Sequence, residues 1–142
     1  MLEVACSRCE RRGRLQVDLL VAQYGDACNI GHLDLAGLER KFAIIKKHCE
    51  DVGRDYNTIR RTVLFNCAIA ETDEAALAKS ISFARNIPSG RIREQALVGT
   101  PDRIRQRLLE IEQAGAQEII IYMPDARDLE PVRLFARECI RR

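Results

Sequence analysis

Three apolar runs alternate with helix-like segments along most of the chain, and this alternation constrains the fold more than any other feature. The runs lie at residues 27–30, 62–70 and 118–123. Apolar runs with little polar alternation are typical of strands that are covered on both faces, as in parallel sheets. Strands that alternate with helices predict right-handed βαβ units. We therefore expect an α/β fold with a parallel sheet.

Start and stop signals bound each expected helix. N-cap residues precede four helices, at Asp34, Thr72, Thr100 and Asp128. The first helix repeats apolar residues at three- and four-residue steps and should end at Gly53. The last helix is expected to turn five residues inward: Val132, Phe135, Ala136, Cys139 and Ile140. The polar stretch 85–96 is interpreted as an excursion or lid-like loop.

Composition excludes several classes of function. The net charge of +2 comes from interleaved acids and bases, so no broad basic face is expected. Aromatic residues make up 5% of the chain, which argues against a stacking platform for nucleic acid. No segment approaches the roughly 20 apolar residues of a membrane span, and the N-terminus resembles no signal peptide. We expect a cytoplasmic protein that binds neither nucleic acid nor membrane.

Six cysteines in such a compartment should stay reduced. Four of them lie in apolar runs and are interpreted as small core residues: Cys28, Cys49, Cys67 and Cys139. Cys6 and Cys9 form a CxxC motif in a basic head, residues 1–19. A structural zinc site needs four ligands and no second pair is present, so no metal is expected; if one bound, Cys6 and Cys9 would be its candidates.

Three further segments, taken together, resemble the luciferase-like monooxygenases. The similar segments are LVAQYGDACNI at 20–30, KKHCEDVGRD at 46–55, and VGTPD at 98–102 followed by AGA at 114–116 and IIIYMP at 119–124. Their order and spacing match the C-terminal portion of that family of flavin- and deazaflavin-dependent oxidoreductases. The resemblance extends over residues 20–142.

The resemblance implies a partial (β/α)8 TIM barrel that contains the last three strand–helix units. It also implies flavin mononucleotide or a deazaflavin coenzyme as cofactor and a small organic molecule as substrate. The family holds the cofactor phosphate with a glycine-rich segment, whereas Gly13 stands alone in the head of this chain. No phosphate site and no catalytic residue can therefore be assigned, and the isolated chain is expected to be inactive.

Barrel sites lie at the carboxyl ends of the strands. That rule predicts six positions close to cofactor or substrate: Asn29, Gly31, His32, Glu71, Met123 and Asp125. A turn, cap or rim role is the alternative for each of them. His32 is a better candidate for proton transfer than His48, which is expected to be a solvated helix residue.

Two functions remain open at this point. The first is an oxidoreductase, or a part of one. The second is a non-catalytic α/β fragment that acts through self-association or partner binding. Three parallel strands cannot close a barrel and leave open edges, so we expect a homo-oligomer or an association with a missing barrel half.

Overall fold

A computed structural model describes residues 2–5, 12–15, 17–31, 33–85, 87, 90–124 and 128–140. Its elements in chain order are β1 (Leu2–Ala5), β2 (Arg12–Leu15), α1 (Val17–Tyr24), β3 (Ala27–Gly31), α2 (Leu35–Val52), a 3-10 turn η1 (Tyr56–Thr58), β4 (Arg60–Ile69), α3 (Asp73–Ala84), α4 (Ile92–Gln95), β5 (Leu97–Gly99), α5 (Pro101–Gln113), β6 (Glu118–Tyr122) and α6 (Glu130–Cys139).

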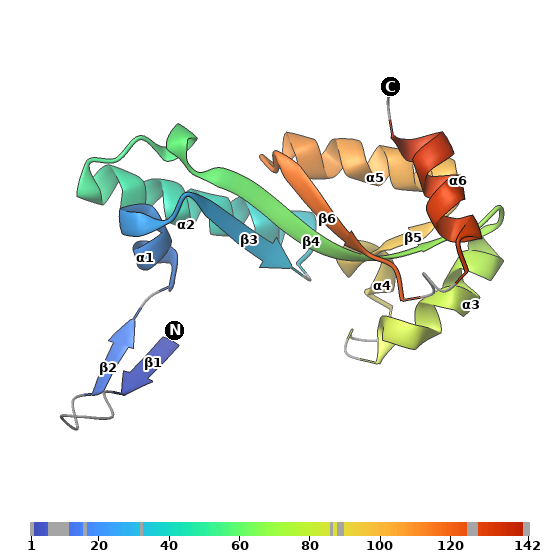
Figure 1. Cartoon of the computed structure of the whole chain (residues 1–142), viewed down its shortest axis with the longest axis horizontal. Helices are drawn as coiled ribbons and strands as arrows, with labels where there is room; N and C mark the ends of the chain where they lie inside the picture. The colour runs from blue at the N-terminus through green and yellow to red at the C-terminus, as the bar shows by residue number, and fades with distance from the viewer. Residues whose placement is uncertain are drawn as a thin grey trace.

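Strand β4 is the centre of a parallel sheet, and each of the other three strands pairs with it (Figure 1). The N–H of Arg60 donates to Asp26 O at 2.9 Å, just before β3, and the N–H of Ala70 donates to Gly99 O in β5 at 3.3 Å. Amides an even number of residues apart point to the same side of a strand. β3 and β5 therefore share one edge of β4, and β6 takes the other.

The expected parallel arrangement is confirmed. The three runs found in the sequence are β3, β4 and β6, and they are neighbouring parallel strands. The structure adds β5, which the sequence did not reveal because three residues are too few to show a period. It also places the helix α4 inside the stretch that was expected to be a loop.

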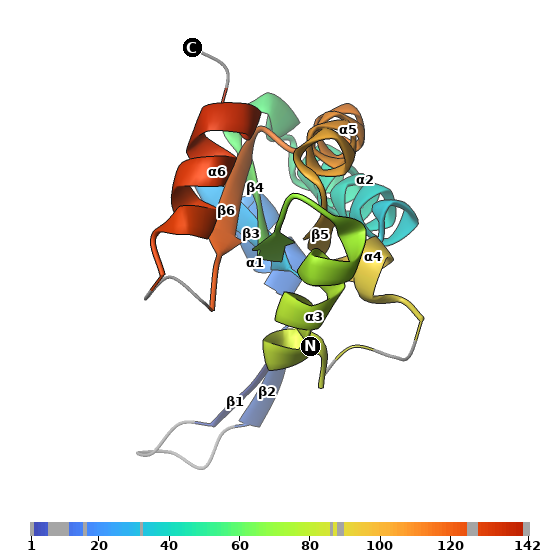
Figure 2. The ribbon, with the colours of Figure 1, turned by 90° about the vertical axis from the view of Figure 1, so that its right-hand side faces the viewer.

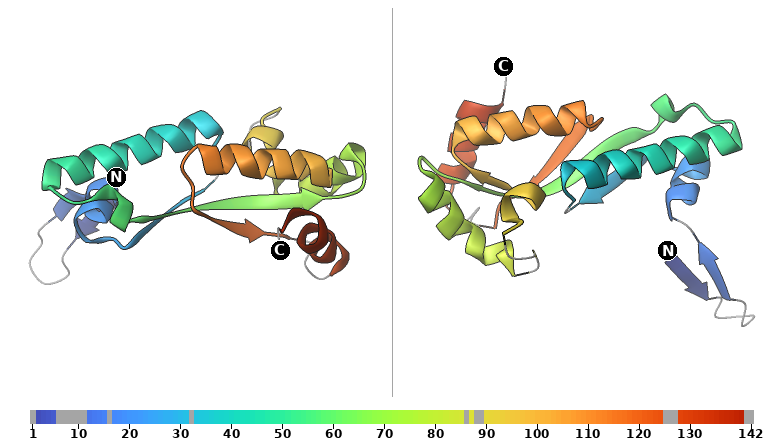
Figure 3. Two further views of the ribbon diagram at one scale, coloured as in Figure 1. Left: turned by 90° about the horizontal axis from the view of Figure 1, so that it is seen from above. Right: turned by 180° about the vertical axis from the view of Figure 1, so that it is seen from behind.

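Helices α2 and α5 lie on the same side of the sheet, α2 towards β3 and α5 towards β6 (Figure 3). Four odd-numbered residues of β4 face this layer and are almost fully buried: Val63, Phe65, Cys67 and Ile69. They form the main core with Leu38, Phe42, Ile45 and Cys49 of α2 and Ile104 and Ile111 of α5. A second cluster joins α3 and α4 to the carboxyl end of β4 through Ala68, Ala76 and Val98.

Two expectations about burial are wrong. β6 is not covered on both faces, because Ile119 and Ile121 are half-buried whereas Ile120 and Tyr122 are exposed. In α6, Phe135 is buried and Cys139 half-buried, but Val132, Ala136 and Ile140 are exposed. Apolar identity in the sequence did not show which side of each element has a neighbouring layer.

The side-chain caps predicted at Asp34 and Thr72 are confirmed, whereas Thr100 occupies the N-cap position of α5 without a side-chain cap hydrogen bond. The carboxylate of Asp34 accepts the N–H of Gly37 at 2.8 Å, and Gly53 ends α2 in the left-handed conformation at a φ of 71°. Thr72 caps α3 through Ala75 N. Asp128 accepts the N–H of Glu130, although Leu129 is the residue immediately before α6.

Replacing Asp34 by alanine is expected to lower the free energy of unfolding by about 1 kcal/mol, because the first turn of α2 loses its side-chain acceptor. Asp34 also pairs with Arg91. Asp34→Asn keeps an acceptor oxygen but loses the charge, so it should retain most of the stability. Urea unfolding of both variants measures the difference. An Asn variant as unstable as the Ala variant would show that the ion pair matters more than the cap.

The first two strands form a separate antiparallel hairpin that projects away from the main sheet (Figures 1 and 2). Helix α1 begins at Val17 and so spans the boundary expected between residues 19 and 20. Cys6 and Cys9 lie outside the described residues.

Within the described part of the chain, no helix is long and apolar enough to cross a membrane. The same residues contain no group of three or more His, Cys, Asp or Glu side chains arranged to hold a metal ion.

Candidate functional site

On the sheet face opposite α2 and α5, the side chains of Thr62, Leu64 and Asn66 in β4 are joined by side chains of β3 and β6, whereas Ala68 further along this face is covered by α3. Pairing register places Asn29 beside Thr62, Gly31 and Ile120 beside Leu64, and Tyr122 beside Asn66. We call this surface the open face and define it by Asn29, Gly31, Thr62, Leu64, Asn66, Ile120 and Tyr122. Ile120 is 43% exposed and Tyr122 is 58% exposed. The open face thus combines apolar area with two amide side chains.

A hydrogen bond from β4 to β3 fixes one end of the open face. The buried hydroxyl of Thr62 donates to the carbonyl of Cys28 at 2.8 Å and lies 3.3 Å from the side-chain oxygen of Asn29. In the next row, a Cβ on Gly31 would lie 3.3 Å from Leu64 O and 3.4 Å from Leu64 Cβ. Glycine therefore leaves Leu64 unobstructed at the middle of the face.

The structure does not bring all the predicted site residues together. Asn29 lies opposite Thr62, and β4 continues for seven more residues to Ile69, about 23 Å at 3.3 Å per residue. Asn29 and Gly31 therefore belong to the open face, whereas Glu71 lies far beyond them. Met123 is partly buried and packs against the main core. His32 and Asp125 lie outside the described residues.

Glu71 lines a cavity of about 380 Å³ at the carboxyl edge of β4, between the start of α3 and the start of α6. Four charged side chains contribute to its lining: Glu71, Lys79, Glu130 and Arg137. The carboxylate of Glu138 accepts a hydrogen bond from Arg137 and raises the pKa of its guanidinium; the charges of Glu71 and Glu130 act in the same direction. The cavity therefore has balanced charge and a firmly protonated arginine.

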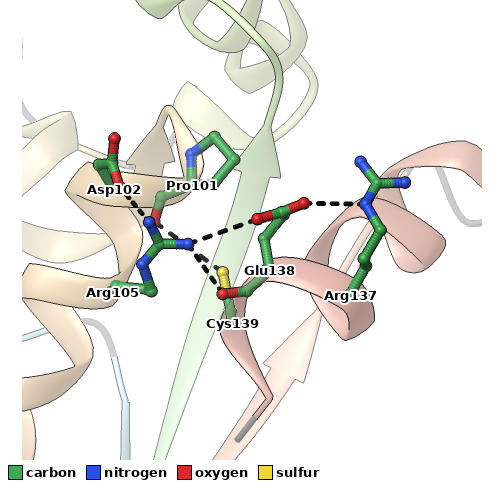
Figure 4. A network of polar contacts seen from close by, with 6 residues as sticks. All are labelled: Pro101, Asp102, Arg105, Arg137, Glu138 and Cys139. Atoms are coloured by element: carbon green, nitrogen blue, oxygen red, sulfur yellow. Dashed lines mark hydrogen bonds and ion pairs between the residues drawn. The ribbon is translucent and has the colours of Figure 1, made fainter.

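A polar network holds α6 against the start of α5 and so fixes one wall of this cavity (Figure 4). Arg105 of α5 donates to the carbonyl of Glu138 at 2.9 Å and pairs with its carboxylate at 3.6 Å. Arg137 donates to the same carboxylate at 2.8 Å. The bonds of Glu138 to Arg137 lower the pKa of its carboxyl group, so it stays ionised at neutral pH.

Reasoning from sequence missed Thr62, Leu64, Asn66, Ile120 and Tyr122 as residues of the open face. The signal was the two-residue period of strands, which puts residues 64 and 66 on one side of β4 and residues 120 and 122 on one side of β6. Only the register of β4 with β6 shows that these two sets lie side by side.

Cys28, Cys49 and Cys67 are buried core residues, as predicted, whereas Cys139 is half-buried. Burial raises the pKa of each of the three buried thiols, and that of Cys67 to about 12. They are therefore protonated at neutral pH and do not act as nucleophiles. His48 lies on α2 with Nδ1 at 3.9 Å from Asp51.

Sequence comparison finds no matching family and no similar curated protein. Solved structures are nevertheless similar. An F420-dependent secondary alcohol dehydrogenase, solved with an F420–acetone adduct, matches with a TM-score of 0.73 and 14% identity over 85% of this chain and 44% of its own. The coenzyme F420-dependent tetrahydromethanopterin reductase of Methanopyrus kandleri matches with a TM-score of 0.65 and 12% identity, over 85% and 46% of the two chains. EDTA monooxygenase from Chelativorans sp. BNC1 matches with a TM-score of 0.63 and 15% identity, over 89% and 43%.

These likenesses show the fold. The chain folds as part of a TIM-type barrel, and its fold is similar to that of two F420-dependent enzymes and a monooxygenase. It spans less than half the length of each of the three structures named above.

Proposed function

We propose that this chain supplies one wall of the cofactor pocket in a flavin- or deazaflavin-dependent oxidoreductase that acts on a small organic substrate. The observation that supports this most directly is the open face. One face of the sheet is buried under α2 and α5, whereas the other leaves Ile120 and Tyr122 exposed beside Asn29 and Asn66. In a barrel the inner face of the sheet is the interior and the site lies at the carboxyl ends of the strands; Tyr122 is the last residue of β6.

The residues of the open face suit the ring system of such a cofactor. Ligand sites are mostly apolar surfaces with a few polar groups that fix orientation. Ile120 and Tyr122 offer apolar contact to a flat ring, and the amides of Asn29 and Asn66 can both donate and accept hydrogen bonds. When bound, a reduced flavin or deazaflavin would supply the hydride or oxygen chemistry, while these side chains orient it and exclude water.

The proposal assigns three of the six predicted site residues to a place in the pocket and leaves the other three unassigned. Asn29 and Gly31 are assigned to the cofactor wall, and Glu71 to the rim, where its cavity is large enough for a small molecule. His32, Met123 and Asp125 stay predictions. The missing strands of the pocket are proposed to come from a complementary barrel half or from a second copy of the chain.

Titration of the chain with flavin mononucleotide and with a deazaflavin coenzyme tests the proposal by quenching of cofactor fluorescence. We expect saturable quenching by at least one of them. Tyr122→Ala should weaken binding about 2- to 10-fold, because a ring contact is worth roughly 0.5–1.5 kcal/mol. Tyr24→Ala is the matched control, since Tyr24 is a still more exposed tyrosine on α1 and outside the open face. No quenching, or an equal effect of both variants, would refute the cofactor wall.

The second candidate is a non-catalytic module that acts through self-association. Exposed Ile120 and Tyr122 lie next to the outer edge of β6, which pairs only with β4 among the described strands. Unpaired edges template the addition of another chain. Light scattering separates the candidates: a concentration-dependent dimer whose formation Tyr122→Ala reduces, together with no cofactor response, would favour this one.

A further inference from the structure

Helix α6 carries more apolar surface than one buried side requires. A helix on the surface of a domain needs an apolar arc of about 100° to pack against its core. Apolar residues of α6 and of its two cap positions form one unbroken arc of about 180°, counted at 100° per residue. They are Leu129, Pro131, Val132, Phe135, Ala136, Cys139 and Ile140. Part of this arc is therefore left over once α6 has packed on its own chain.

The two sides of the arc differ in burial. Pro131 and Phe135 are buried, and Cys139 is half-buried. The exposed residues are Leu129, Val132, Ala136 and Ile140, and we call these four the α6 stripe. They follow one another at steps of three, four and four residues, which is the spacing of a seam between two packed helices. A contiguous exposed apolar surface marks an interaction site, whereas single exposed apolar residues do not.

Cations border the α6 stripe on one flank. Arg133 and Arg137 lie about 40° and 80° from Leu129 around the helix axis, in the same direction. Their side chains are 67% and 63% exposed. Arg133 donates to Glu130 and Arg137 to Glu138, each at 2.8 Å, and each of these contacts uses one of the five N–H donors of the guanidinium. Both arginines can therefore reach a carboxylate of a second chain.

Acidic residues lie on the opposite flank, along α5. Cys139 lies on this flank, about 80° from Leu129 in the other direction, and its Sγ is 4.0 Å from the carbonyl oxygen of Pro101 at the start of α5 (Figure 4). A groove of about 560 Å³ runs between the end of α6 and the outer side of α5. The charged residues of its lining are Asp102, Arg105, Glu112 and Glu138. Three carboxylates and one arginine make this groove negative.

We propose that the α6 stripe is the interface of a homodimer, in which α6 packs in parallel against α6 of a second copy. A two-fold axis along the helices brings the arginine flank of each copy to the acidic flank of the other. An antiparallel pair would instead place like flanks together, arginine beside arginine. The interface has no residue in common with the open face, so it does not depend on whether that face binds a cofactor.

This dimer also accounts for the pattern of α6 in the sequence. Val132, Ala136 and Ile140 were expected to face inward but are exposed on the single chain. In the dimer they are covered by a second copy instead of by their own core. Both copies use the same surface, so the assembly closes at two chains.

Sedimentation equilibrium of the full chain over a range of concentrations tests the dimer. We expect a reversible dimer for the wild type. Ala136→Arg should raise its dissociation constant about 100-fold or more, because two like charges then meet at the centre of the seam. Ala78→Arg is the matched control, since Ala78 is an exposed alanine of α3 outside the stripe. Arginine favours helix formation, so both variants should fold, and circular dichroism checks that they do.

A monomer at every concentration, or equal weakening by the two arginine variants, would overturn the proposal. Tyr122→Ala should leave this dimer unchanged, because Tyr122 belongs to the open face. A dimer that Tyr122→Ala weakens and Ala136→Arg does not would also overturn it, in favour of association through the open face.

Cysteine crosslinking tests the orientation of the two helices. In a parallel pair each stripe residue lies beside the same residue of the second copy, so Val132→Cys and Ala136→Cys should both form disulfide-linked dimers under mild oxidation. Ala78→Cys, treated in the same way, should crosslink no more than the wild type with its native cysteines. Crosslinking at neither stripe position, or at only one of them, would contradict the parallel pairing.

Discussion

Replacing Phe65 by alanine is expected to lower the free energy of unfolding by about 3–5 kcal/mol, a large share of the stability of a domain this size. Phe65 is fully buried in the main core, in the middle of β4 and opposite Ile121 of β6. The substitution removes the ring and leaves a cavity between the sheet and its helices. Denaturant unfolding followed by circular dichroism measures the loss.

Tyr122→Ala is the matched control for this prediction. It truncates an aromatic residue of the same sheet, one row further along, but on the open face. Substitutions of exposed residues usually change stability by no more than about 0.5 kcal/mol. A Phe65→Ala variant no less stable than Tyr122→Ala would mean that the sheet is not packed against α2 and α5 as described.

Alkaline pH is expected to destabilise the protein through Cys67. Burial raises the pKa of this thiol from 9.0 to about 12, so the folded state keeps it protonated where the unfolded state ionises. Its contribution to stability is complete below about pH 9 and is lost as pH rises towards 12. The loss amounts to about 1.4 kcal/mol per pH unit, hence roughly 2 kcal/mol at about pH 10.5.

The comparison that isolates this effect is between wild type and Cys67→Ala over the same pH range. Burial also raises the pKa of Cys28, Cys49 and Tyr56, so some alkaline destabilisation should remain in the variant. Above pH 9, the free energy of unfolding should fall more steeply with pH in wild type than in Cys67→Ala, and this difference in slope is the contribution of Cys67. Cys139→Ala, which removes a half-buried thiol, should change the slope less. Parallel slopes for wild type and Cys67→Ala would contradict the prediction.

The sequence predicted the local features of the fold well, because each is encoded within a few neighbouring residues. The acceptor at Asp34, the left-handed Gly53 and the cap at Thr72 all depend on backbone groups at most a few residues away. The three longer strands are apolar enough to be found by composition alone. Strand β5 is not, since its three residues form a strand only because Cys67 to Ile69 lie beside them.

The candidate site was predicted less well, because it depends on register rather than on local pattern. The rule that barrel sites lie at the carboxyl ends of strands indicated residues after β3 and β4. It assumed that the two strands end side by side. Their pairing instead places Gly31 opposite Leu64, five residues before the end of β4. The pairing of Asn66 with Tyr122 was equally invisible, since these residues are far apart in the sequence.

The central position of β4 also determines when the sheet can form during synthesis. A side-chain bond from β4 to β3 spans 34 residues, and one from β4 to the segment before β6 spans 56 residues. Ribosomes add about 5–20 residues per second. The edge of β4 that pairs with β6 therefore stays unpaired for roughly 3–11 s after β4 is synthesised. During that interval the nascent chain presents a template for aggregation, and co-translational chaperone binding over β4 would protect it.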